Sequence, residues 1–179
     1  MTEMTAGYAR ALFDLAQEEK CSDAFLHQLQ VLSAAFSAEP DFLRLLANPG
    51  ISKAERCQLL DESFRERIHL YVLNFLKLLT EKGDILRFHD CVRQFQAYYN
   101  DANGILCVSV VSAVALSEQQ REKLLQKLEA VTGKKVQLEM KLDPACLGGL
   151  RLDYDGKRID GTVRNRLDAM AKQLSRATL

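Results

Sequence analysis

The stretch KVQLEMKLDPACLGGLRLDYDGKRIDGTVRNRLDAMAKQL, residues 135–174, decides the fold of the C-terminal part of the chain. Apolar and polar residues alternate from Val136 to Leu142, and this pattern predicts a β-strand with one apolar face. Pro144 ends the strand, because proline has no N–H to donate to a neighbouring strand. The stretch therefore predicts sheet structure in this part of the molecule.

A hairpin and a helix are expected in the remainder of the stretch. Asp155-Gly156 is typical of a two-residue hairpin turn, since both residue types tolerate positive φ. Such a turn places Asp153 opposite Arg158 on the paired strand. Asp160 is expected to cap a final helix, whose apolar stripe consists of Val163, Leu167, Met170, Ala171 and Leu174.

Composition excludes several classes of protein. The chain has 179 residues, enough for one domain or two small ones, and its formal net charge of zero argues against nucleic-acid binding. Its five cysteines are odd in number and include no C-x-x-C pair, so free thiols in a reducing compartment are expected. It shows neither a signal peptide nor an apolar run long enough to span a bilayer. We therefore expect any role at a membrane to depend on partners.

The first hundred residues are expected to contain helices only. Short connections between them predict an antiparallel six-helix bundle. Ser52–Glu55 is a capping box that starts the fourth helix, and Gly83 is expected to end the fifth. Asp84 is expected to cap the sixth. The helices are predicted at about 5–19, from 22, from 40, from 53, at about 66–82 and from 84.

The periodicity changes at the turn-rich segment NDANG, residues 100–104. Ile105 to Val111 is an apolar, β-rich run that is expected to form a strand buried on both faces. Ser117–Gln120 is a capping box for a helix that ends at Gly133. The sequence thus predicts an α+β protein of two domains: a helical bundle at 1–103 and a small α/β domain of about four strands and two helices at 104–179.

Motifs that carry chemistry are nearly absent. Thr132–Lys135 resembles the end of a phosphate-binding loop, but Leu128 stands where the first glycine is needed. The three histidines have no metal-ligand partner one turn away. We expect no catalytic, cofactor-binding or metal-binding residue. A small enzyme remains an open alternative, because paired carboxylates could come from Asp143, Asp153, Asp155 and Asp160, although turns favour aspartate anyway.

Two of the expected helices, 5–19 and 66–82, carry more apolar residues than a core-facing stripe of about 100° can hold. Either they are the most central helices of the bundle, or together they form a groove for an amphipathic helix of another protein. The pattern alone leaves both interpretations open.

The chain resembles the delta subunit of bacterial rotary (F-type) ATP synthases, whose mitochondrial counterpart is the oligomycin-sensitivity-conferring protein. The resemblance covers nearly the whole chain. Asp84 and Thr162 depart from it, since the family more often has arginine and serine there. The matching segments are YARALF (8–13), NP (48–49), NFLKLLTEKG (74–83), VSA (111–113), LSEQQ (116–120), DP (143–144), LGG (147–149) and IDGTVRNRL (159–167).

The resemblance implies a non-catalytic stator component. Such a subunit ties the catalytic head to the peripheral stalk, so that the head resists rotor torque during proton-driven ATP synthesis. The helical domain is then expected to receive the N-terminal helix of an alpha subunit in a groove between helices 5–19 and 66–82. The groove residues expected on this basis are Tyr8, Ala11, Leu12, Leu15, Leu73, Phe75 and Leu76.

The resemblance also implies that the C-terminal domain meets the b subunits of the stalk, through Gly148, Gly149, Arg164 and Arg166. An equally open alternative is that these glycines serve backbone packing and these arginines only solvate a helix face.

Further expectations concern the setting of the protein. We expect one copy per complex, no bound nucleotide, and a peripheral location on the cytoplasmic face of the bacterial inner membrane. A bacterial source is expected, because the first helix starts close to Met1 and leaves no room for a transit peptide. The alternative function is a regulatory adaptor that binds some other amphipathic helix.

Overall fold

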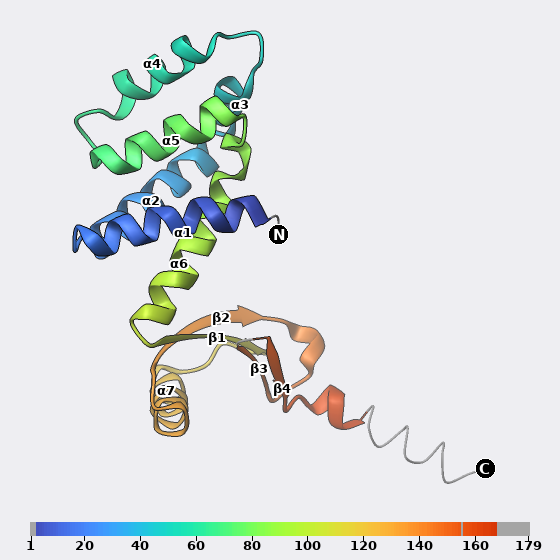
Figure 1. The fold of residues 1–179 in the computed structure, drawn as a ribbon. Coiled ribbons are helices and arrows are strands. Elements are labelled where there is room, and N and C mark those ends of the chain that lie inside the picture. The colour runs from blue at the N-terminus through green and yellow to red at the C-terminus, as the bar shows by residue number, and fades with distance from the viewer. Residues whose placement is uncertain (1–2, 155, 168–179) are drawn as a thin grey trace. The chain divides into compact units, whose positions relative to one another are not determined.

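The structure is a computed structural model that describes residues 3–154 and 156–167. It divides into two compact units, residues 1–99 and 100–179, and each is considered by itself. A helical part is followed by a small mixed sheet, as the sequence predicts. The helices, shown in Figure 1, are α1 (Glu3–Glu18), α2 (Ser22–Ala38), α3 (Pro40–Ala47), α4 (Lys53–Phe64), α5 (Leu70–Lys82), the short 3-10 turn η1 (Ile85–Arg87) and α6 (Phe88–Ala102).

Aromatic and aliphatic side chains from these helices form one core. Phe36 and Phe88 meet edge to face with ring centroids 5.1 Å apart, and Phe13 meets Phe95 in the same way at 5.6 Å. Such pairs contribute about 0.5–1.5 kcal/mol each beyond the area that they bury. The largest fully buried side chains of this core are Phe25, Phe88, Phe95, Leu29, Leu46, Leu60, Leu73, Leu76, Leu79, Ile85 and Val72.

Local signals place most helix ends correctly. Ser52 and Glu55 form the predicted capping box, and Gly83 ends α5 with φ +78°. The fifth helix starts later than predicted, at Leu70, because His69 is its N-cap and accepts the Tyr71 N–H. The predicted cap at Asp84 is wrong. Its side chain caps no backbone N–H and instead pairs with Arg87 at 3.3 Å.

The second unit contains a four-stranded mixed sheet in the order β2-β1-β3-β4. β1 and β2 are parallel, and the other two pairings are antiparallel. Asp153 lies opposite Arg158, which confirms the hairpin register. The elements are β1 (Ile105–Ser112), α7 (Glu118–Thr132), β2 (Lys135–Leu142), the 3-10 turn η2 (Pro144–Cys146), β3 (Leu150–Tyr154) and β4 (Lys157–Asp160).

The expected final helix begins in the described part of the chain, where residues 163–167 are helical. Its cap is Thr162, whose hydroxyl accepts the Asn165 N–H at 3.2 Å, and not Asp160 as predicted. Asp160 does not cap the helix itself; its carboxylate accepts a hydrogen bond from the Thr162 hydroxyl at 2.7 Å. The predicted stripe positions Met170, Ala171 and Leu174 lie outside the described residues.

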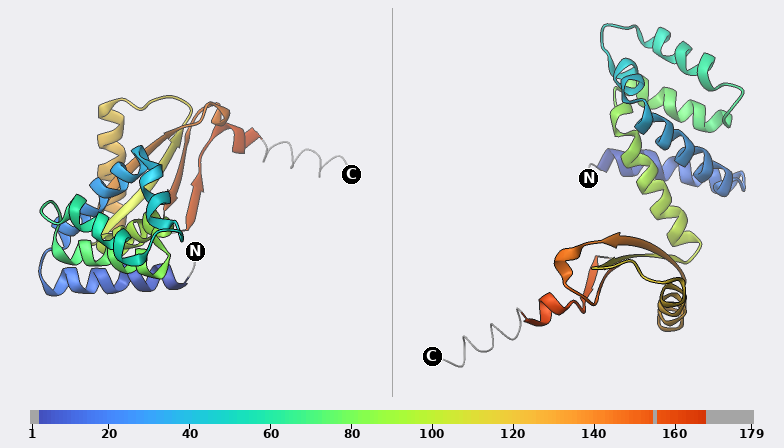
Figure 2. Two further views of the ribbon diagram at one scale, coloured as in Figure 1. Left: turned by 90° about the horizontal axis from the view of Figure 1, so that it is seen from above. Right: turned by 180° about the vertical axis from the view of Figure 1, so that it is seen from behind.

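α7 lies against one face of the sheet (Figures 1 and 2). Leu124 and Leu128 of α7 pack on a small apolar cluster made by Leu106, Val108, Val110 and Val136. On the opposite face of β1, Cys107 is exposed and Ser109 is half-buried. Val111, on that same face, is 3% exposed, so β1 is buried on both faces only toward its C-terminal end and the prediction is right only there. Apolar residues occur on both faces of β1, but within the described residues α7 covers only one face of the sheet.

Candidate functional site

α1 and α5 lie side by side and run antiparallel. The Tyr8 hydroxyl is 3.5 Å from Asp84, which follows the end of α5. At the other end of the pair, the Tyr71 hydroxyl donates to Glu19, just after α1, at 3.3 Å. Each contact joins the beginning of one helix to the end of the other, so the two helices present a shared surface along their length.

Four of the seven expected groove residues belong to the core. Leu12, Leu73 and Leu76 have exposed fractions of 3%, 1% and 0%, and Phe75 is 6% exposed. A partner reaches none of these side chains while the core stays closed. Their position holds α1 and α5 against the other helices.

The outward side of α1 carries the other three expected residues. Ala11 is exposed, Leu15 is 39% exposed, and Tyr8 is half-buried. Met4, which sequence reasoning missed, lies on the same stripe and is 55% exposed. Positions 4, 8, 11 and 15 follow the spacing of neighbours on one helix face. They make a continuous stripe on the side of α1 that faces α5.

Two residues of α5 complete this surface, the half-buried Tyr71 and the exposed Leu78. Lys77 pairs with Asp61 of α4 at 2.7 Å and so marks the α4 side of the helix. Tyr71 marks the opposite side, because it reaches the end of α1. Leu78, seven residues after Tyr71, lies within about 20° of it around the helix, and it is 39% exposed. We call Met4, Tyr8, Ala11, Leu15, Tyr71 and Leu78 the α1–α5 strip.

The α1–α5 strip carries no charge at neutral pH. The Glu19 carboxylate raises the pKa of the Tyr71 hydroxyl, which keeps this phenol neutral. Met4, Tyr71 and Leu78 could have been found as the apolar positions left over once the core stripe of each helix is assigned. The strip therefore offers an apolar surface with two phenolic hydroxyls.

Gly149 has a structural task in the second unit. Its φ is +79°, and a Cβ added there lies 2.4 Å from the carbonyl oxygen of Gly161. Only glycine allows this close approach of two backbone segments. Gly148 is less constrained, since its Cβ would lie 3.3 Å from the Val163 side chain. This geometry supports the packing role for Gly149 that sequence reasoning left open.

The four expected stalk residues do not line one cavity. Gly148 and Gly149 line a cavity of about 400 Å³ beside α7. Arg164 lines a separate one of about 190 Å³ with Asp143 and Asp160. Arg164 and Arg166 are both exposed.

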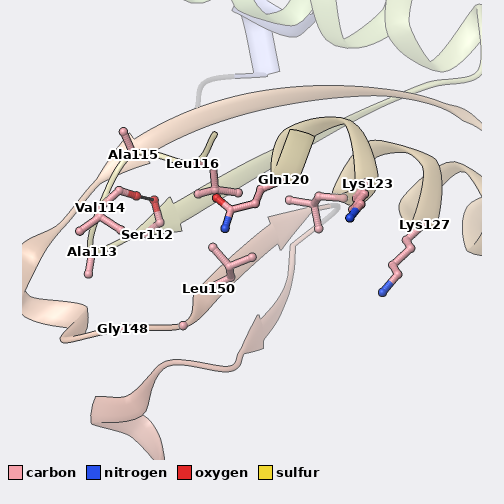
Figure 3. A pocket seen from close by; sticks show the side chains of 12 residues that line it. Ser112, Ala113, Val114, Ala115, Leu116, Gln120, Lys123, Lys127, Gly148 and Leu150 are labelled. Carbon is pink, nitrogen blue, oxygen red and sulfur yellow. Dashed lines mark hydrogen bonds between the residues drawn. The ribbon is translucent and has the colours of Figure 1, made fainter. Parts of the chain in front are cut away.

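The larger cavity lies between α7, the loop after β1 and the start of β3 (Figure 3). Leu116 and Gln120 stand over Leu150, with the loop residues at one end and two lysines at the other. We call it the α7 cavity. Its lining residues are Ser112, Ala113, Val114, Ala115, Leu116, Gln120, Lys123, Leu124, Lys127, Gly148, Gly149 and Leu150.

The hairpin aspartates are held ionised by the fold. Arg158 donates to Asp153 at 2.6 Å and lowers the pKa of that carboxyl. Hydrogen bonds from Thr162 lower the pKa of Asp160. A general acid needs a pKa near the working pH, so neither group suits that task. Of the other two candidate aspartates, Asp143 accepts the Ala145 N–H at 3.0 Å, and Asp155 lies outside the described residues.

Cysteine thiols and potential metal ligands are the other groups that could carry chemistry. No disulfide joins any of the five cysteines. Burial raises the pKa of the Cys91 thiol to about 11, which leaves it unreactive. No group of three potential metal ligands occurs among residues 3–154 and 156–167. A search of the same residues finds no helix with the length and apolar character needed to cross a bilayer.

Comparison with known proteins assigns the family. The model of the family described as "ATP synthase delta (OSCP) subunit" matches residues 5–174. ATP synthase subunit delta of Chlorobium limicola is 34% identical over 167 residues, which are 93% of this chain and 92% of the relative. The same subunit of Alkaliphilus oremlandii is 32% identical over 169 residues, or 94% of each chain. A chain in the cryo-EM structure of the Toxoplasma gondii mitochondrial ATP synthase hexamer shares the fold, with a TM-score of 0.74 at 22% identity over 97% of this chain and 98% of that one.

Proposed function

Because the chain belongs to the ATP synthase delta (OSCP) subunit family, a non-catalytic stator component of F-type ATP synthase, we propose that it ties the catalytic head to the peripheral stalk. One copy of the chain holds the head against rotor torque during proton-driven ATP synthesis. The helical unit binds the N-terminal helix of an alpha subunit, and the C-terminal unit binds the b subunits.

The observation that carries this proposal is the α1–α5 strip. It is a partly exposed surface of uncharged side chains on two antiparallel helices, and an amphipathic helix laid along it packs against both. Tyr8, Ala11 and Leu15 make this contact together with Leu78 of α5. The buried Leu12, Leu73, Phe75 and Leu76 set the spacing of the two helices beneath it.

A tether under torque must dissociate slowly, and the apolar side chains of the α1–α5 strip favour slow dissociation. A nanomolar dissociation constant requires about 12 kcal/mol. Complete burial of one leucine side chain contributes about 1.5–3 kcal/mol, whereas an exposed ion pair contributes about 1 kcal/mol or less. Apolar side chains therefore contribute more to slow dissociation than rim charges do.

The stalk contact lies on the C-terminal unit, around Gly148 and Gly149 and the exposed Arg164 and Arg166. Through these two contacts the complex keeps the chain at the cytoplasmic face of the bacterial inner membrane, and the chain reaches the membrane through its partners.

Calorimetric titration into a catalytic head that lacks its own delta subunit tests the head contact. Leu78→Glu places a carboxylate in an apolar interface, and the cost of removing it from water should lower the affinity by about tenfold or more. Leu45→Glu is the matched control, since Leu45 of α3 is 40% exposed against 39% for Leu78. We expect a loss of affinity with Leu78→Glu only. Equal affinity for the wild type and both variants contradicts the assignment of the strip.

A further inference from the structure

The α7 cavity has apolar walls and an open apolar edge. Leu116, Leu124 and Leu150 are half-buried and line it from the loop, from α7 and from β3. Val114 also lines it, yet 74% of its surface is exposed. An exposed apolar residue that adjoins other apolar residues is more typical of a binding site than one that stands alone on the surface. The cavity is therefore a surface that an apolar side chain from outside can fill.

The charges around the α7 cavity have one sign. Lys123 and Lys127 are the charged residues among its lining, and no aspartate or glutamate lines it. Within residues 3–154 and 156–167, neither lysine forms an ion pair. The two lysines are four residues apart and thus neighbours on one face of α7. A complementary ligand carries negative charge beside an apolar group.

We propose that the α7 cavity is the docking site for an acidic amphipathic helix of the peripheral stalk. The helix lies along α7, inserts an apolar side chain between Leu116 and Leu150, and pairs two carboxylates one turn apart with Lys123 and Lys127. A helix meets this spacing directly, because acids at its positions i and i+4 match the two lysines one turn apart on α7. This inference rests on the proposed function and gives the stalk contact a location and a chemistry.

The size of the cavity admits one competitor. Its volume of about 400 Å³ lies within the range of small-molecule sites. A small amphipathic acid, such as a medium-chain fatty acid, would use the same apolar wall and the same lysines. The experiment must therefore separate a stalk helix from a small acid.

The test is a titration of the full chain against purified b subunits in detergent. The double variant Lys123→Glu/Lys127→Glu should weaken binding by about tenfold or more, because rim charges set complementarity. Arg121→Glu changes the same charge on a part of α7 that does not line the cavity and should leave the affinity unchanged. Val114→Glu should also weaken binding, and its control is Val131→Glu, since both valines are exposed, at 74% and 85%.

The outcomes separate this inference from the proposed function. Weakening by the cavity variants, with both controls unchanged, supports it. If the wild type binds the b subunits and the cavity variants bind equally well, the cavity assignment is wrong while the tether stands. If the wild type does not bind the b subunits, the proposed stalk contact fails and the inference fails with it. If decanoate binds stoichiometrically in the cavity without displacing the b subunits, the ligand is a small acid and the inference is overturned.

Discussion

Replacing Gly149 by alanine should destabilise the C-terminal unit by far more than an ordinary glycine substitution. The left-handed backbone at φ +79° alone costs an L-residue about 1–2 kcal/mol. In addition, the new Cβ would lie 2.4 Å from the Gly161 carbonyl oxygen, so the two backbone segments must separate. Separation strains the hydrogen bond from the Gly161 N–H to the Leu150 carbonyl, now 2.9 Å. Together these effects amount to about 3–5 kcal/mol.

Amide hydrogen exchange of peptides from β1 and β3 measures this loss as a fall in the free energy of opening. Gly156→Ala is the matched control. Gly156 also has a positive φ, +70°, but an added Cβ meets nothing within 4 Å. We expect Gly156→Ala to lower the stability by only about 1–2 kcal/mol, the cost of a left-handed backbone in an L-residue. Equal losses in the two variants would refute the argument that the close approach to Gly161 requires glycine.

Three more predictions concern stability. Arg56 is 7% exposed and donates to the Leu46 carbonyl at 2.9 Å, so Arg56→Met should cost about 1–3 kcal/mol by leaving that acceptor unpaired, and urea unfolding measures it. Ser52→Ala removes the cap of α4 and should cost about 1 kcal/mol, seen as a lower unfolding midpoint. Arg158 lowers the pKa of Asp153 below its ordinary 3.8, so this pairing stabilises the fold fully above pH 3.8 and less as the pH falls through the folded-state pKa. In the wild type, acid should therefore weaken the exchange protection of β3 and β4 below pH 3.8. Asp153→Asn should reduce this acid-dependent loss, and an unchanged pH profile would contradict the prediction.

Local chemistry made much of the fold predictable. Asp155-Gly156 set the hairpin register, and the capping boxes at Ser52 and Ser117 set two helix starts. The failures involve tertiary contacts. Asp84 has the right residue type for a cap but pairs with Arg87 instead. No local signal reveals such a competing partner.

The interaction surface was less predictable than the fold. Periodicity shows that α5 has more apolar positions than one narrow stripe, but it does not show how wide the buried face is. In the structure that face is wide, and it includes Leu73, Phe75 and Leu76. The sequence can flag the apolar positions left outside the core stripe, but only neighbours such as the Lys77–Asp61 pair, which marks the α4 side of α5, show which of them share one surface. The packing of the whole unit decides which apolar residues remain available to a partner.

The central claim is that one chain binds head and stalk together. Sedimentation velocity of purified catalytic head, lacking its own delta subunit, and b subunits in detergent tests it directly. We expect the two to sediment separately without this chain, and as one larger complex when one equivalent is added. Separate sedimentation of head and b subunits in the presence of the chain would contradict the tether and would favour an adaptor for some other amphipathic helix.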